Sequence, residues 1–224
     1  MVCRILVNQL EQDVQLVYLP NPALNGDELR RAIATELAVD SVDSTNLVEE
    51  IQAKLIELAR RGLPVVLFVD EAQALSDEAL EVLRLFGNLE TEYNKLIQIV
   101  LFGQPELDER LEQHHLRQFR QRITFSARLR MLTIAEVVAY IDNRLEKSGG
   151  EDGIFTVSQK KAIWKASRGI PRLVNQICHK CLVLACSQRS LSVNNEQLFS
   201  AIHDTYDSCK PKFKSPLIWG WSLS

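Results

Sequence analysis

The chain has 224 residues and a formal net charge of -3, with 46% hydrophobic and 25% charged residues. This is an ordinary globular balance, and the length is enough for a full hydrophobic core and for one large or two modest domains. The slight acidic excess argues against a dedicated nucleic-acid binder. Five cysteines without the dense spacing of a disulfide scaffold, and no signal-peptide pattern after Met1, predict a cytoplasmic location.

The first part of the chain alternates between helical and strand patterns. Apolar residues at helical spacing predict one helix near the start, and Asn25 followed by Glu28 is typical of a capping box that begins another. Gly62 is the expected end of a third helix. The predicted helices are 2–10, 25–37 and 45–62, and the predicted strand is 14–20.

The middle of the chain contains continuous apolar runs. The run VVLFV at 65–69 is typical of a strand in a parallel sheet that is covered on both faces. Ser76 is the expected N-cap of the helix that follows this strand. Two more strands are predicted, at 96–103 and 123–129. Strands alternating with helices favour an α/β domain with right-handed crossovers.

After about residue 132 the pattern is helical only. Thr133 with Glu136 and Thr156 with Gln159 form capping boxes, Pro171 suits the first turn of a third helix, and Asn194 begins a fourth. We therefore predict three parts: an α/β domain at 1–132, a small helical domain at 133–205 and a C-terminal tail at 206–224.

Two acidic residues, Asp70 and Glu71, directly follow the apolar strand 65–69. In nucleotide hydrolases an aspartate in this position holds Mg²⁺ through water, and a neighbouring glutamate orients the attacking water. Open α/β sheets bind their ligands at the carboxyl ends of the strands, which is where this pair lies. The alternative is an acid pair that simply begins a surface loop.

Gln104 follows the next apolar strand, so its amide would reach the same edge if the two strands are neighbours. The alternative is a loop amide before a turn-forming proline. Further along, Arg117, Arg120 and Arg122 could include an arginine that reaches a neighbouring subunit's nucleotide. The alternative for each of them is a solvated basic helix face.

Arg172 lies in the first turn of a predicted helix, where a cation opposes the helix dipole unless an anion such as a phosphate is near. It could equally be an exposed arginine. The pair Cys178 and Cys181 (CHKC) has the spacing of half a zinc site, but it lies in an apolar helical stripe without a second ligand pair. Buried free thiols are the preferred interpretation.

Several segments together resemble a known family. VVLFVDEAQALSDEALEVLRLFGNLET, IQIVLFGQPELDERL, LRQFRQRI and GIPRLVNQICHKCLVLA are similar to AAA+ ATPases of the general secretion pathway A type, and especially to the form associated with mannose-sensitive haemagglutinin (MSHA) pilus biogenesis. The resemblance covers about residues 1 to 205. It implies a P-loop NTPase fold with a helical lid, and ATP and Mg²⁺ as cofactors.

The resemblance also implies roles for single residues. Asp70 and Glu71 match the Walker B pair, with Asp70 holding Mg²⁺ through water, and Gln104 matches sensor 1. Arg172 matches sensor 2 and would contact the nucleotide, and Arg122 is the first choice for an arginine finger. The implied partners are further copies of the chain or other ATPase subunits, and secretion or pilus assembly proteins at the inner face of the inner membrane.

The family's phosphate-binding loop, G-x-x-x-x-G-K-[ST], has no match in this sequence. In relatives it directly precedes a helix that resembles MVCRILVNQL. We therefore expect an N-terminally truncated copy that lacks the first strand of the 5-1-4-3-2 sheet, so that strands four and five flank a gap. Such a copy would be a poor ATPase.

Two other functions stay open. One is a DNA-handling AAA+ ATPase of the transposition type, which should show a basic face; the acidic balance counts against nucleic acid as a partner. The other is a non-catalytic interaction module that keeps the fold. Residues 210–221, which combine lysines with Trp219 and Trp221, could touch a membrane surface or be a frayed end.

Overall fold

The computed structural model describes residues 6, 9–10, 14–20, 23–39, 46–90, 95–150, 153–213 and 221. The chain divides into two compact units, Met1–Ser126 and Ala127–Ser224. The domain boundary predicted at residue 132 lies a few residues after Ser126, where the first unit ends.

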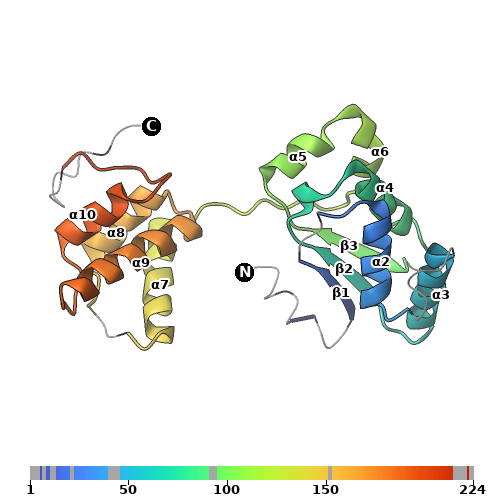
Figure 1. Cartoon of the computed structure of the whole chain (residues 1–224), viewed down its shortest axis with the longest axis horizontal. Coiled ribbons are helices and arrows are strands. Elements are labelled where there is room, and N and C mark those ends of the chain that lie inside the picture. The colour runs from blue at the N-terminus through green and yellow to red at the C-terminus, as the bar shows by residue number, and fades with distance from the viewer. Residues whose placement is uncertain are drawn as a thin grey trace. The chain divides into compact units, whose positions relative to one another are not determined.

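The first unit contains a parallel sheet of three strands in the order β1 (Gln15–Leu19), β2 (Val65–Val69) and β3 (Ile97–Leu101) (Figure 1). Val69, the last residue of β2, lies opposite the last residue of each neighbouring strand. The carboxyl ends of all three strands therefore finish level at one edge. The predicted parallel α/β fold is confirmed, and so are three of its four predicted strands.

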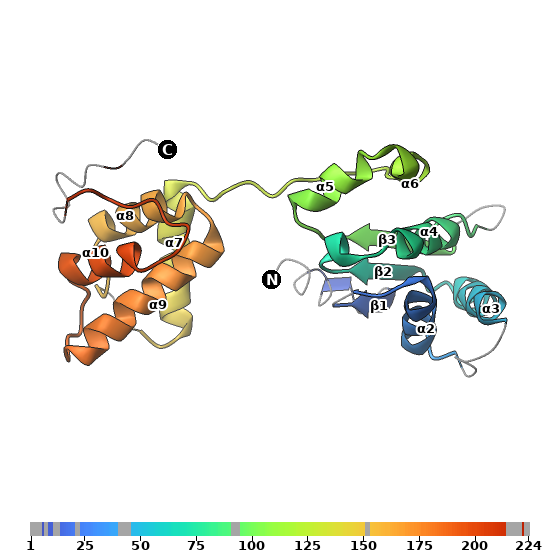
Figure 2. The same ribbon diagram turned by 45° about the horizontal axis from the view of Figure 1, so that its top comes forward.

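Successive residues of β2 face opposite sides of the sheet, as expected for a strand. Val65, Leu67 and Val69 belong to a core that they share with the helices α2 (Gly26–Glu36), α3 (Leu47–Arg60) and α4 (Asp77–Phe86). Figure 2 shows these helices beside the strands. Val66 and Phe68 face the opposite side, where Leu6 and Leu10 pack against them. All five residues of β2 are buried. The rest of the predicted helix 2–10 lies outside the described residues.

Two predicted helix starts in this unit are confirmed, while α3 begins at Leu47 and not at the predicted residue 45. Asn25 accepts hydrogen bonds from the N–H groups of Asp27 and Glu28, and the Glu28 side chain bonds back to the Asn25 N–H, which completes the capping box. Ser76 Oγ accepts from the N–H of Ala79 at 3.1 Å and begins α4.

Three short helical elements follow β3: α5 (Pro105–Leu111), η2 (His114–Leu116) and α6 (Arg117–Arg120). The strand predicted at 123–129 was wrong, because residues 121–133 contain neither helix nor strand. Phe125 is 91% exposed and Leu129 82% exposed. An apolar run becomes a strand only when a neighbouring backbone pairs with it, and among the described residues this run has no such neighbour.

The second unit is helical, with α7 (Ile134–Lys147), α8 (Val157–Ser167), α9 (Pro171–Ser187) and α10 (Asn195–His203) around its own core. The predicted capping boxes at Thr133 and Thr156 are present, and Asn194 begins α10 with a third. Pro171 is in the first turn of α9, as predicted.

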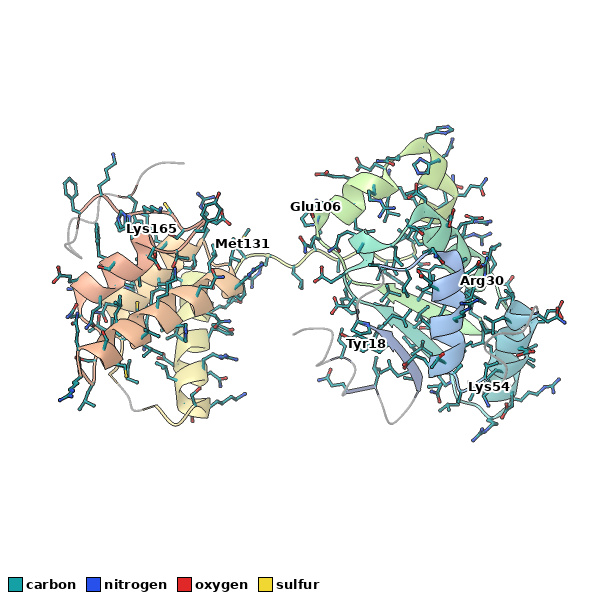
Figure 3. All side chains as sticks on the ribbon, in the orientation of Figure 1. Tyr18, Arg30, Lys54, Glu106, Met131 and Lys165 are labelled. Carbon is teal, nitrogen blue, oxygen red and sulfur yellow. The ribbon has the colours of Figure 1, made fainter. Side chains whose placement is uncertain are left out.

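The start of the second unit is tied to the turn between α8 and α9. The Leu132 N–H donates to Gly169 O at 2.9 Å, and Trp164 Nε1 donates to Leu132 O at 2.9 Å. Figure 3 labels Met131 on the stretch just before this attachment. Most of the predicted membrane-contacting tail, 214–220, lies outside the described residues. Among the helices that the structure describes, none has the length and apolar character needed to span a bilayer.

Candidate functional site

Asp70 directly follows β2 at the level edge of the sheet. Its N–H donates to Leu19 O at 2.9 Å, so the backbone pairing with β1 continues to this residue. The carboxylate accepts from the Glu71 N–H at 3.0 Å, and the hydroxyl of Tyr18, a β1 residue labelled in Figure 3, lies 3.4 Å from its other oxygen. The Asp70 carboxylate is therefore held from both its own loop and the neighbouring strand.

Glu71 has an unusual backbone conformation, with φ 54° and ψ 38° in the left-handed region. This region costs a residue with a side chain about 1–2 kcal/mol. The other described non-glycine residues with positive φ follow helices, whereas Glu71 follows a strand and begins the short helix η1 (Ala72–Ala74). Strained backbone is concentrated at functional sites, because the surrounding contacts must over-determine it.

Gln104 reaches Glu71 from the adjacent strand. The backbone between them is paired, since the Ala72 N–H donates to Phe102 O and the Phe102 N–H donates to Val69 O, each at 2.8 Å. Gln104 Nε2 then donates to Glu71 Oε2 at 3.2 Å. Gln104 therefore meets Glu71 of the predicted acidic pair.

Gln73 makes a bridge that sequence reasoning missed. Its side-chain Nε2 donates to Glu71 Oε2 at 2.5 Å, and its Oε1 accepts from the backbone N–H of Gln104 at 3.1 Å. One amide therefore joins the carboxylate of the first loop to the backbone of the second. Glu71 Oε2 accepts from two amide groups, while Glu71 itself remains exposed.

Arg110, near the end of α5, holds the same loop from the other side. Its Nη1 donates to Gln73 O at 2.9 Å and to Leu75 O at 2.7 Å, and its Nη2 pairs with Asp77 at 2.5 Å. His115 Nε2 lies 2.8 Å from the second oxygen of Asp77. Hydrogen bonds from Arg110 and then His115 lower the pKa of Asp77 below its ordinary value. Its anionic form is therefore favoured in the folded protein.

The predicted arginines are exposed. Arg117 and Arg120 lie at the two ends of α6, and Arg122 follows in the irregular stretch. Arg172 lies in the first turn of α9 in the second unit, directly after Pro171. Asp70, Glu71 and Gln104 come together in the first unit, and the roles of the four arginines stay predictions.

The pair Cys178 and Cys181 lies on α9 within the core of the helical unit. Burial raises the pKa of Cys178 to about 12, and it raises the pKa of Cys181 further, with a smaller contribution from the neighbouring thiol. Metal binding requires thiolates, which this environment disfavours. In the part of the chain that the structure describes, no three His, Cys, Asp or Glu side chains gather closely enough to bind a metal ion.

The side chains at these strand ends are suited to binding a metal ion and to orienting a water molecule. The Asp70 and Glu71 carboxylates and the Gln104 amide lie at the carboxyl ends of adjacent parallel strands, where ligands of open α/β sheets bind. Exposed carboxylate oxygens are the donors that Mg²⁺ prefers, and a carboxylate held by amide donors can orient a water molecule.

Comparisons with known proteins find relatives at the level of both sequence and fold. A family model described as an AAA domain matches residues 1–111. General secretion pathway protein A of Aeromonas hydrophila is 38% identical over 206 residues, which are 91% of this chain and 38% of that protein. The chain thus spans well under half the length of this relative.

Two solved structures are similar in fold. The ORC2 protein of Aeropyrum pernix, in ADPNP–ADP complexes, superimposes with a TM-score of 0.67 at 15% identity, over 91% of this chain and 56% of that one. Cdc6p of Pyrobaculum aerophilum gives a TM-score of 0.68 at 18% identity, over 89% and 55%. At these identities the likeness shows the P-loop NTPase fold alone. The chain belongs to the AAA+ family, with general secretion pathway protein A among its relatives.

Proposed function

We propose that the chain is an AAA+ ATPase subunit that hydrolyses ATP with Mg²⁺ in support of envelope assembly. The observation that carries the proposal is the contact between Glu71 and Gln104, beside Asp70, at the ends of β2 and β3. Proteins of this family generally bind nucleotide with Mg²⁺. Mg²⁺-bound ATP would supply the phosphoanhydride bond that is broken and a cation to balance the charge that develops.

The residues at the strand ends fit such a ligand. Asp70 would hold the metal ion through water, since its carboxylate lies at the end of β2 and is partly exposed. Glu71 would orient the attacking water and accept its proton, and the Gln104 amide would touch the terminal phosphate or that water. Arg172 would contact the nucleotide from the helical lid, which the predicted domain division assigns to 133–205.

The affinity of the 224-residue chain for nucleotide is expected to be weak. A P-loop provides backbone N–H groups and a lysine for the phosphates, and the sequence contains no G-x-x-x-x-G-K-[ST] segment. We therefore propose that the chain binds Mg-ATP in the millimolar range and hydrolyses it slowly. Experiments on the site need millimolar nucleotide and single-turnover sensitivity.

The biological setting follows from the named relative. We propose that the chain serves type II secretion or assembly of a type IV pilus of the MSHA kind, at the inner face of the inner membrane. It would act as a homo-oligomer or with partner ATPase subunits. Arg122 would then act on a neighbouring subunit's nucleotide, and residues 210–221 would contact the membrane surface.

Metal and nucleotide binding can be tested without turnover. Mn²⁺ added with excess ATP to the ¹⁵N-labelled chain should broaden the backbone signals of Asp70, Glu71 and Gln104 before those of the rest of the chain. Asp70→Asn should remove this local broadening, whereas Glu106→Gln, an exposed acid on α5, should leave it unchanged. Broadening centred elsewhere, or none at millimolar ATP, would contradict the proposal.

Hydrolysis tests the role of Glu71. Glu71→Gln should lower the single-turnover rate by about 100-fold or more, the usual contribution of a positioned general base, and should leave Mg-ATP affinity within about two-fold. Mixing Glu71→Gln with Arg122→Ala protein should restore part of the rate, since one interface would then combine an intact Glu71 with an intact Arg122. An unchanged rate in Glu71→Gln would refute the assignment.

A further inference from the structure

We infer that Gln73 is a positioning residue that sets the orientation of the Glu71 carboxylate relative to Gln104. The inference rests on the proposed function and extends it to a residue with no assigned role. The Gln73 side-chain amide makes two hydrogen bonds: its Nε2 donates to Glu71 Oε2, and its Oε1 accepts from the Gln104 N–H.

The orientation of the Gln73 amide is determined by its partners. Turning the amide over would place its NH₂ group against the Gln104 N–H, donor against donor, and its oxygen against the Glu71 carboxylate, acceptor against acceptor. Only one orientation satisfies both neighbours. The carboxylate is consequently held at a defined place between the Gln73 and Gln104 amides, at 2.5 Å and 3.2 Å.

The backbone that carries Gln73 is itself anchored. Arg110 donates to the carbonyl oxygens of Gln73 and Leu75, while Gln104 is the N-cap of the helix on which Arg110 lies. Residues near both ends of α5 therefore form hydrogen bonds with the loop after β2. These contacts restrain the loop on which Gln73 lies.

The N–H of Gln104 gives a direct readout. As the N-cap residue, Gln104 precedes the helical hydrogen bonds of α5, and the acceptor of its N–H is Gln73 Oε1. Packing at this point is close, because a Cβ at Gly103 would lie 2.7 Å from Leu107 Cδ2 and 3.3 Å from Gln73 Oε1. Because Gln73 Oε1 accepts from the Gln104 N–H, hydrogen exchange at this N–H should report whether the Gln73 side chain is in place.

The test measures hydrogen exchange at the Gln104 N–H in the full chain without nucleotide. Gln73→Leu should speed exchange roughly five- to ten-fold, the scale of one lost hydrogen bond. Gln73→Glu should retain most of the protection, because its carboxylate can still accept from this N–H. Gln121→Leu, which changes an exposed glutamine elsewhere, should match the unsubstituted chain.

Single-turnover hydrolysis separates positioning from a merely structural role. Both Gln73→Leu and Gln73→Glu should lower the rate at saturating Mg-ATP by ten-fold or more, with the half-saturating concentration unchanged within two-fold. A carboxylate at position 73 cannot donate to Glu71 and repels it, so Gln73→Glu should show slow turnover with a protected Gln104 N–H.

The outcomes keep the two proposals apart. Unchanged Gln104 exchange in Gln73→Leu overturns the positioning inference, whatever the rate of hydrolysis. Faster exchange with a fully retained rate also overturns it, because the bridge would then have no effect on Glu71. Absence of hydrolysis in the unsubstituted chain refutes the proposed function of the 224-residue chain, while the exchange comparison still decides whether Gln73 holds the loop.

Discussion

The helix caps of the helical unit and the candidate site of the α/β unit rest on polar contacts of different range. In the helical unit, Thr133, Thr156 and Asn194 each form a capping box with the residue three positions later. In the α/β unit, the contacts of Gln104 with Glu71 and Gln73 join residues 33 and 31 positions apart. Helix starts are therefore set by neighbours in sequence, whereas the candidate site exists only when β2 and β3 are paired.

This difference has an energetic consequence. A capping contact forms with its own helix and contributes about 1 kcal/mol to it. The contacts around Glu71 require two loops to be ordered first, and they hold one residue in the left-handed region at a cost. We therefore expect perturbation of the α/β core to remove the site, while the helical unit keeps its structure.

The largest expected effect comes from the sheet core. Leu67 is fully buried in the middle of β2. Leu67→Ala should destabilise the first unit by about 2–5 kcal/mol, because the substitution leaves a cavity in the core. All three tryptophans, Trp164, Trp219 and Trp221, belong to the second unit, so their fluorescence should keep its unfolding midpoint. Hydrogen exchange measured by mass spectrometry resolves both units.

The reciprocal variant is Ile177→Ala, which removes a fully buried side chain from the core of the helical unit. It should lower the tryptophan midpoint and leave the protection of β2 unchanged. Equal losses in both units for either variant would show that the units do not unfold independently, and the comparison would then fail.

Gly169 shows that the helical unit also contains a demanding long-range contact. Its φ is 76°, and a Cβ there would lie 2.2 Å from Leu132 O. Gly169→Ala should therefore cost more than the about 1–2 kcal/mol of a left-handed alanine. Gly149→Ala is the matched control, since Gly149 has φ 72° and nothing within 4 Å. Equal losses of thermal midpoint would rule out the close approach to Leu132 as the cause.

Replacing Arg110 should have an intermediate effect on stability, and this effect should be confined to the first unit. Arg110→Met keeps much of the apolar stem but removes the donors to Gln73 O and Leu75 O, so the expected loss of stability is about 1–3 kcal/mol. Exchange of the amides in residues 71–75 should rise, and the pKa of Asp77 should move up towards its ordinary value. Unchanged exchange in this loop would disprove the anchoring role of α5.

The smallest effect is a pH dependence in the helical unit. Hydrogen bonds from Arg130, and then from the backbone and side chain of Thr133, lower the pKa of Glu136 from 4.5 to about 2. The ionised form stabilises the folded state, so this contribution is full above pH about 4.5 and is lost as the pH falls through about 2. Tryptophan fluorescence at a series of pH values should show a falling thermal midpoint across this window.

Glu136→Gln should flatten that part of the pH profile and lower the midpoint near neutral pH. The control is Glu146→Gln, which changes an exposed acid on the same helix. If Glu136→Gln and the unsubstituted chain lose stability in parallel between pH about 4.5 and 2, the Glu136 pair is not the source of the dependence.

Much of the fold could be predicted because its signals are local. Asn25, Ser76 and Thr156 begin helices in the structure as their side chains predict, since a cap needs only the next turn of backbone. The apolar run 65–69 is a buried strand, and parallel pairing of neighbouring strands accounts for the meeting of Glu71 with Gln104. The prediction of a strand at 123–129 was wrong, because a strand forms only when a neighbouring backbone pairs with it.

The sequence by itself determined the capped helix starts, the buried strand β2 and the acidic pair at its end, because each is encoded by residues within a few positions of one another. Only the tertiary structure decided that Gln73 bridges Glu71 and Gln104, and that Arg110 holds the same loop. These contacts form between segments that the sheet and α5 bring together. Hydrogen bonds act over about 3 Å, so they depend on where the backbone has folded and not on spacing along the chain.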